Sequence, residues 1–236
     1  MFGVPIERIK KGNPEYGLRA KGKVAELALG YQGSAGALIS MGALNMGLTE
    51  EELPDIVSRW RKANPRIKDL WYTCENAALE VMHTGKPVGI NKGIIFAREY
   101  DLSSGLDFFT VRLPSGRKLY YPHPFLSNND FGKEALHYYG TGQQNKNFSV
   151  QSTYGGKLTE NIVQAVARDC LAVTLQRLDD MGLDIVMHVH DEVIIDCPKD
   201  KITQEQACEI MGLPISWAEG LPLKAAGFES QYYMKD

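Results

Sequence analysis

The strongest constraint on the fold is a long helical pattern that leads directly into two short apolar runs. Residues 158–182 carry apolar side chains at the spacing of one helix face, and Gly182 is a typical helix stop. The segment "LDIVMHVHDEVIIDCP" follows and is typical of two strands with "HDE" at a tight turn between them. The inner stripe of the helix is predicted to consist of Ile162, Ala165, Val166, Asp169, Cys170, Val173 and Leu178.

The preceding part of the chain changes from helical to strand-like near residue 87. Residues 16–30 have helical character, Thr49 and Glu52 have the spacing of a capping box, and Pro65 suits the first turn of a helix that ends near Gly85. The runs "VGINKGIIFA", "LDFFTVRL" and "KLYYP" are typical of strands, and "PSGR" is the turn of a hairpin. Residues 123–158 are expected to be an irregular connection, and the carboxyl-terminal end a loop with a last short strand.

This order of elements predicts an α+β fold with a mostly helical lobe and a small antiparallel sheet. A length of 236 residues allows one large domain or two lobes. With 44% hydrophobic and 23% charged residues and no low-complexity run, the composition excludes disordered and fibrous classes.

The cysteine spacing, the length of the apolar runs and the distribution of charge limit where such a chain can function. The four cysteines include no C-x-x-C pair, which gives neither a zinc site nor a disulfide scaffold, so we expect a reducing, cytoplasmic setting. The sequence contains no apolar run of the roughly 18 residues that a membrane span needs. The net charge of −3 conceals a basic amino-terminal segment, since residues 1–23 hold six basic and two acidic side chains.

The turn between the last two strand-like runs carries an acidic pair, Asp191 and Glu192. Carboxylates held at the edge of a sheet can bind Mg²⁺, which takes one or two protein carboxylates and keeps sites for water and phosphate. Two other interpretations stay open: a solvated polar turn, and a zinc or iron site of a metallohydrolase with His188, His190 and Asp191 as ligands.

A second candidate feature is the stripe of Arg19, Lys23, Leu27 and Tyr31, which are spaced by four residues over about 18 Å of helix. Two cations along this length can hold separate phosphates of a triphosphate, and the Tyr31 ring offers a stacking surface for a base or sugar. The alternative is a solvated basic helix face with a core tyrosine. A carboxylate turn for a metal ion and a cationic helix for a polyphosphate are the two halves expected of a metal-assisted nucleotidyl-transfer site.

These motifs resemble those of a known family. The pattern "R-x3-K-x3-L-x3-YQG" is similar to the fingers-helix motif of family A DNA polymerases, the bacterial DNA polymerase I class, and "HVHDEV" is similar to their palm motif with the second catalytic aspartate. The segments "ALGYQGSAGAL", "LPSGRKLYYP", "YGGKLTENIVQAVARD" and "SWAEGLPLKAAGF" most resemble the phage and prophage branch. The resemblance covers essentially the whole chain.

The resemblance implies template-directed addition of deoxynucleotides to a primer 3′ end with two Mg²⁺ ions, in DNA replication. It implies part of the polymerase right-hand fold, with a fingers subdomain at residues 1–135, including a hairpin at about 87–122, and the carboxy-terminal part of the palm at 136–236. The implied partners are primer-template DNA and deoxynucleoside triphosphates.

The resemblance also implies individual roles. Lys23 contacts the α- and γ-phosphates, Arg19 the triphosphate tail, and Tyr31 the incoming sugar and the template base. Asp191 binds metal, Glu192 supports that site, and His190 contacts the primer terminus. Asn161 and Gln164 lie on the helix near the duplex minor groove, and Gln151 is the other candidate for the family's minor-groove glutamine.

The chain departs from the family pattern in two places. Leu27 stands where many members carry an aromatic residue that faces the sugar. The family's upstream palm motif, an Asp followed by Tyr or Phe, Ser and a nearby Glu, has no match before residue 19. We therefore expect Met1 to correspond to an interior point of the family sequence, and another chain to supply the missing palm and thumb half. Alone, the chain is expected to show little or no activity; the alternative function is a non-catalytic DNA-binding remnant.

Overall fold

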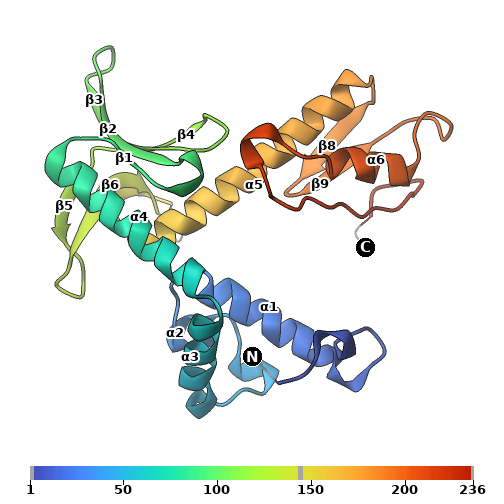
Figure 1. Cartoon of the computed structure of the whole chain (residues 1–236), viewed down its shortest axis with the longest axis horizontal. Coiled ribbons are helices and arrows are strands. Elements are labelled where there is room, and N and C mark those ends of the chain that lie inside the picture. The colour runs from blue at the N-terminus through green and yellow to red at the C-terminus, as the bar shows by residue number, and fades with distance from the viewer. Residues whose placement is uncertain (1–2, 143–145, 235–236) are drawn as a thin grey trace. The chain divides into compact units, whose positions relative to one another are not determined.

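The computed structural model describes residues 3–142 and 146–234 and has the expected α+β composition (Figure 1). It divides into two compact units, one made of Met1–Val111 and Leu119–Asn161, the other of Arg112–Lys118 and Ile162–Asp236. The predicted fingers and palm boundary at residues 135 and 136 stays a prediction. The main helices are α1 (Leu18–Leu29), α2 (Ala35–Ser40), α3 (Leu53–Ala63), α4 (Pro65–Thr84), α5 (Gly155–Asp180) and α6 (Gln204–Met211).

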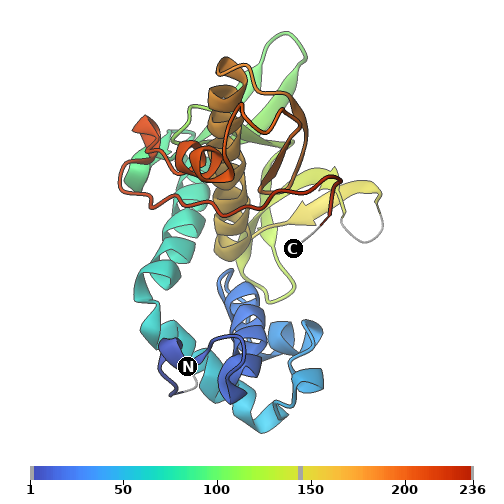
Figure 2. The ribbon, with the colours of Figure 1, turned by 90° about the vertical axis from the view of Figure 1, so that its right-hand side faces the viewer.

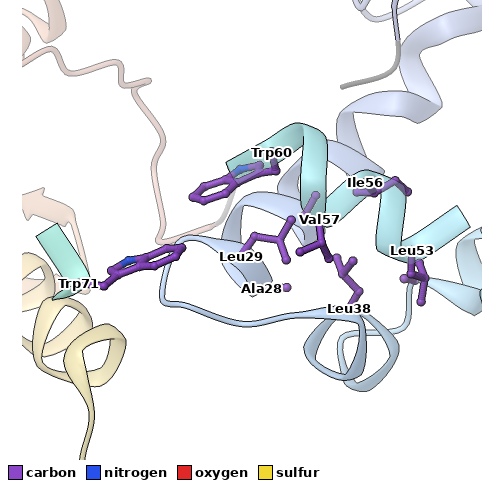
Figure 3. Packing of buried hydrophobic residues seen from close by; sticks show 10 residues of the cluster. Ala28, Leu29, Leu38, Leu53, Ile56, Val57, Trp60 and Trp71 are labelled. Atoms are coloured by element: carbon purple, nitrogen blue, oxygen red, sulfur yellow. The ribbon is translucent and has the colours of Figure 1, made fainter. Parts of the chain in front are cut away.

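The helical core of the first unit is formed by α1, α2, α3 and the start of α4. The predicted capping box exists, with the Thr49 N–H donating to Glu52 Oε2 at 2.8 Å just before α3. Leu29, Leu38 and Val57 meet between the helices (Figure 3), and the rings of Trp60 and Trp71 lie 6.0 Å apart in nearly parallel planes. The full cluster is Ala25, Ala28, Leu29, Leu38, Ala43, Leu53, Ile56, Val57, Trp60 and Trp71.

Two antiparallel sheets complete the first unit, and α4 packs against strands of both (Figures 1 and 2). The predicted hairpin is confirmed as neighbouring strands joined by the "PSGR" turn. The first sheet has the order β1-β2-β3-β4, with β1 (Val88–Gly89), β2 (Ile95–Asp101), β3 (Leu106–Arg112) and β4 (Lys118–Pro122). The second has the order β5-β6-β7, with β5 (Phe125–Asn128), β6 (Glu134–Thr141) and β7 (Phe148–Ser152).

The prediction of an irregular connection over residues 123–158 is wrong, because this segment contains the three strands of the β5-β6-β7 sheet and the start of α5. The period-two signal is hidden in β6, where three consecutive residues, Ala135, Leu136 and His137, are all buried. A strand covered on both faces shows no alternation of apolar and polar residues.

The second unit contains most of α5, the two-stranded sheet of β8 (Ile185–Val189) and β9 (Glu192–Ile195), and α6. The predicted last strand is wrong, since no strand follows β9 within the residues described up to 234. The helix α6 was not predicted, although Thr203 and Gln206 form a capping box at its start. In the described part of the chain, no helix is both long and apolar enough to cross a membrane.

Candidate nucleotide and metal site

The cationic stripe lies on the exposed side of α1. Arg19, Lys23 and Leu27 are exposed, with 47% of the Leu27 surface open to solvent, while Ala25, Ala28 and Leu29 are buried against the helical core. The helical spacing of the apolar residues therefore places them on the inward face of α1 and the two cations on the face exposed to solvent. This placement is compatible with phosphate binding and with the solvated basic face that the sequence also allowed.

Tyr31 differs from the other stripe residues because it lies two residues beyond the end of α1 and is half-buried. Burial raises the pKa of its phenol, and the nearby carboxylates of Glu160 and Glu26 raise it further. A Cβ added at Gly33 would overlap the Ala28 carbonyl oxygen, so the chain needs glycine there to fold back against α1. Tyr31 therefore sits at a tightly packed end of α1 and is not a freely moving surface ring.

The acidic pair lies where the sequence predicts it, at the tip of the β8-β9 hairpin. Val189 pairs with Glu192, which leaves His190 and Asp191 as the two turn residues. His190 has a φ of 52°, the left-handed conformation that such turns require. The side chains of His190, Asp191 and Glu192 are exposed. The hairpin thus presents two carboxylates and an imidazole to solvent on neighbouring residues.

The carboxyl-terminal tail reaches this hairpin. The hydroxyl of Tyr233 donates to Glu192 Oε2 at 3.5 Å, a long contact between exposed side chains. It orients Glu192 only weakly.

The zinc or iron site proposed for a metallohydrolase gains no geometric support. Within residues 3–142 and 146–234, no three His, Cys, Asp or Glu side chains converge as a metal-binding group. His188 lies on β8 and His190 in the turn, so the two imidazoles are not consecutive on one strand face. The adjacent carboxylates of Asp191 and Glu192 fit Mg²⁺ better, because that ion accepts few protein ligands and prefers oxygen.

The three candidate DNA-contacting amides have different surroundings. Gln151 on β7 donates to the Ser149 hydroxyl at 3.0 Å, and half-buried Asn161 on α5 donates to the Tyr121 hydroxyl at 3.0 Å. Burial is the main reason that the pKa of Tyr121 rises to about 12. Gln164 is exposed on α5.

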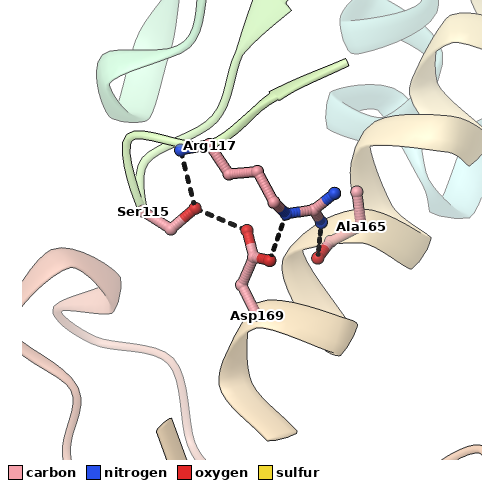
Figure 4. A network of polar contacts seen from close by, with 4 residues as sticks. All are labelled: Ser115, Arg117, Ala165 and Asp169. Carbon is pink, nitrogen blue, oxygen red and sulfur yellow. Dashed lines mark hydrogen bonds and ion pairs between the residues drawn. The ribbon is translucent and has the colours of Figure 1, made fainter. Parts of the chain in front are cut away.

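A polar network that the sequence did not reveal fixes the "PSGR" turn to α5 within the second unit (Figure 4). Asp169, predicted in the inner stripe of the helix, is buried and accepts from Arg117 Nε at 2.6 Å and from the Ser115 hydroxyl at 2.5 Å. Arg117 also donates to the Ala165 carbonyl at 2.9 Å. The sequence did contain a signal for this network: Asp169 stands at an inner helix position, and a buried carboxylate requires a polar partner.

The candidate residues divide between the two units. Arg19, Lys23, Leu27 and Tyr31 belong to the first, and His190, Asp191 and Glu192 to the second. Each half of the predicted site is therefore formed within its own unit.

The cationic face of α1 and the carboxylate hairpin, the two halves of the site that the sequence predicts, are thus both exposed. The chain is 56% identical over 237 residues to the DNA polymerase of Bacillus phage SP02. The match covers 100% of this chain and 35% of that polymerase, so the chain spans about a third of the length of this relative. This similarity confirms the predicted resemblance to a phage DNA polymerase.

No protein-family model matches the chain. No solved structure matches it either.

Proposed function

We propose that the chain is the carboxy-terminal part of the catalytic domain of a family A DNA polymerase that adds deoxynucleotides to a primer 3′ end during DNA replication. The observation that carries this proposal is the identity of 56% to a phage DNA polymerase over the whole chain. The exposed cations of α1 and the exposed carboxylates of the hairpin support it, because both would be accessible to a nucleotide. In this proposal the helical lobe and hairpins form fingers, and the β8-β9 hairpin belongs to the palm of a right-hand fold.

The residues of α1 would bind the incoming deoxynucleoside triphosphate. Lys23 and Arg19 neutralise its phosphates, and the Tyr31 ring contacts the sugar and the template base. Leu27 offers an aliphatic surface on the same helix face, so any discrimination between sugars depends on shape there and not on aromatic stacking.

The hairpin would serve the reacting end of the primer. Asp191 is the proposed ligand of Mg²⁺, which supplies charge stabilisation of the transferring phosphate when it is bound. Glu192 supports that site, and His190 contacts the primer terminus. Among the amides, the exposed position of Gln164 favours it over Gln151 for the minor groove, with Asn161 as a second contact held by Tyr121.

Two Mg²⁺ ions close together repel one another and need more than one protein carboxylate to offset that repulsion. We therefore infer that a polypeptide of residues 1–236 alone extends primers poorly or not at all, and that a chain with the other palm carboxylate and the thumb restores extension. Robust Mg²⁺-dependent extension by this polypeptide, abolished by Asp191→Ala, would refute the inference.

In the complete polymerase, Asp191→Asn is expected to reduce primer extension at least a hundredfold. The matched control is Asp196→Asn, which removes an exposed carboxylate beyond the end of β9 and should leave extension within twofold. Equal effects of both variants would contradict the assignment of Asp191.

Lys23→Ala is expected to weaken binding of a deoxynucleoside triphosphate about tenfold, because one charge-assisted phosphate contact is lost. Lys21→Ala, on the same helix but two residues away, is the control for lost charge. A DNA-binding remnant predicts a different result: primer-template DNA binds, but nucleotide affinity is absent and extension cannot be restored by any second chain.

A further inference from the structure

The end of α1 is joined to the start of α5 by a contact that the proposed function leaves unexplained. Gln32 follows Tyr31, and its Oε1 accepts a hydrogen bond from the Gly156 N–H at 2.8 Å. Both residues belong to the first unit, although 124 positions separate them in the sequence. Gln32 also has a φ of 72°, which is unusual for a residue with a side chain.

The start of α5 lacks a conventional cap. The Tyr154 carbonyl accepts the first intrahelical bond, from the Leu158 N–H at 3.0 Å, so Tyr154 stands in the N-cap position. Its side chain is not one of the short polar groups that normally bond the first free N–H groups of a helix. The Gln32 side-chain carbonyl supplies that acceptor from the turn that follows α1. Gln32 thus acts as a tertiary N-cap of α5.

Glycines make this approach possible. A Cβ at Gly156 would overlap the Tyr31 carbonyl oxygen, and a Cβ at Gly155 would overlap the Trp71 carbonyl oxygen. Trp71 lies at one edge of the core cluster (Figure 3), and its indole donates from Nε1 to the Gly30 carbonyl at 2.8 Å. The backbones of α1, α4 and α5 therefore meet at one junction, and Tyr31 lies in it.

We propose that Gln32 is a positioning residue that fixes the backbone of Tyr31 by capping α5. The proposal rests on the proposed function, in which Tyr31 contacts the incoming nucleotide. In this proposal Gln32 acts through the Tyr31 backbone and not by contact with the nucleotide. Its left-handed conformation is held in place by the bond to Gly156, and without that bond the end of α1 can relax to more favourable backbone angles. The Tyr31 ring then leaves its position beside α5, while the hairpin carboxylates are unchanged.

The cap is tested first by amide hydrogen exchange in the 236-residue chain. Gln32→Met keeps the length of the side chain but removes the acceptor, and exchange at the Gly156 amide is expected to become at least tenfold faster. Gln32→Gly should have the same effect, although glycine accepts the left-handed conformation. The control is Gln176→Met on the exposed side of α5, where the amide donates to Asp180, and exchange at the Gly156 amide should stay unchanged. If exchange at the Gly156 amide stayed unchanged in Gln32→Met or in Gln32→Gly, the assignment of Gln32 as the cap of α5 would be refuted.

The positioning role is tested by steady-state extension with the complete polymerase. Gln32→Met is expected to raise the KM for the deoxynucleoside triphosphate at least fivefold and to change kcat less than twofold. A general structural defect would lower kcat as well. Faster Gly156 exchange with an unchanged KM, or a loss confined to kcat, would overturn the positioning role. Absence of extension by the unsubstituted polymerase would instead refute the proposed function and the role of Tyr31, while the cap is still decided by the exchange measurement.

Discussion

The network of Arg117 and Asp169 predicts an asymmetry between two substitutions that remove the same ion pair. The Asp169 side chain is 9% exposed, whereas that of Arg117 is 45% exposed. Arg117→Ala leaves the buried Asp169 carboxylate without its cation, and the hydrogen bond from the Ser115 hydroxyl remains. Removing one partner of a buried pair costs about 3–5 kcal/mol. Because the Ser115 bond remains, we expect about 2–4 kcal/mol of lost stability for the second unit.

Asp169→Ala leaves a guanidinium that can turn toward water. Only the hydrogen bonds from Arg117 and Ser115 are lost, which amounts to about 1–2 kcal/mol. The difference between the two variants is therefore about 1–2 kcal/mol, or roughly tenfold in the unfolding equilibrium constant.

The assay is urea-dependent hydrogen exchange of peptides from residues 162–180, because a global probe would mix the two units. Arg168→Ala removes an exposed arginine of the same helix and is expected to change stability by less than about 0.5 kcal/mol. A loss for Asp169→Ala as large as that for Arg117→Ala would refute the argument from burial.

Three further predictions concern the first unit. The hydroxyls of Ser104 and Ser103 lower the pKa of Asp101 to about 2. The ionised carboxylate therefore stabilises the turn fully above the ordinary pKa of 3.8, and this stabilisation is lost as pH falls through about 2. Ser104→Ala should raise the pKa of Asp101 in an NMR titration of the carboxyl group. Burial raises the pKa of Tyr121 to about 12. The contribution of Tyr121 to the stability of the first unit is therefore complete below pH 10 and is lost as pH rises toward 12. Tyr121→Phe should flatten this part of the curve of unfolding free energy against pH. Gly33→Ala should destabilise the first unit by about 1–3 kcal/mol because its Cβ would overlap the Ala28 carbonyl, and tryptophan fluorescence during urea unfolding measures this loss.

Local signals were sufficient for α1, α3, α4 and α5 and for the β3-β4 and β8-β9 hairpins, whereas α6 was missed. The capping box before α3, the glycine that ends α4 and the polar turn after β8 each act within a few residues, so the sequence predicts them well. The candidate residues were likewise found from spacing and from the family resemblance, and the structure adds that Arg19, Lys23 and Asp191 are exposed.

The α+β class, the cationic face of α1 and the carboxylate turn could be predicted from the sequence alone, because helix period and turn chemistry are properties of neighbouring residues. Three features became visible only in the folded chain: the β5-β6-β7 sheet, the burial of Asp169 and the contact of Gln32 with Gly156. Each of these depends on residues that are far apart in the sequence. Strands need partner strands, a buried carboxylate needs a cation from another segment, and a helix start can take its cap from a distant turn.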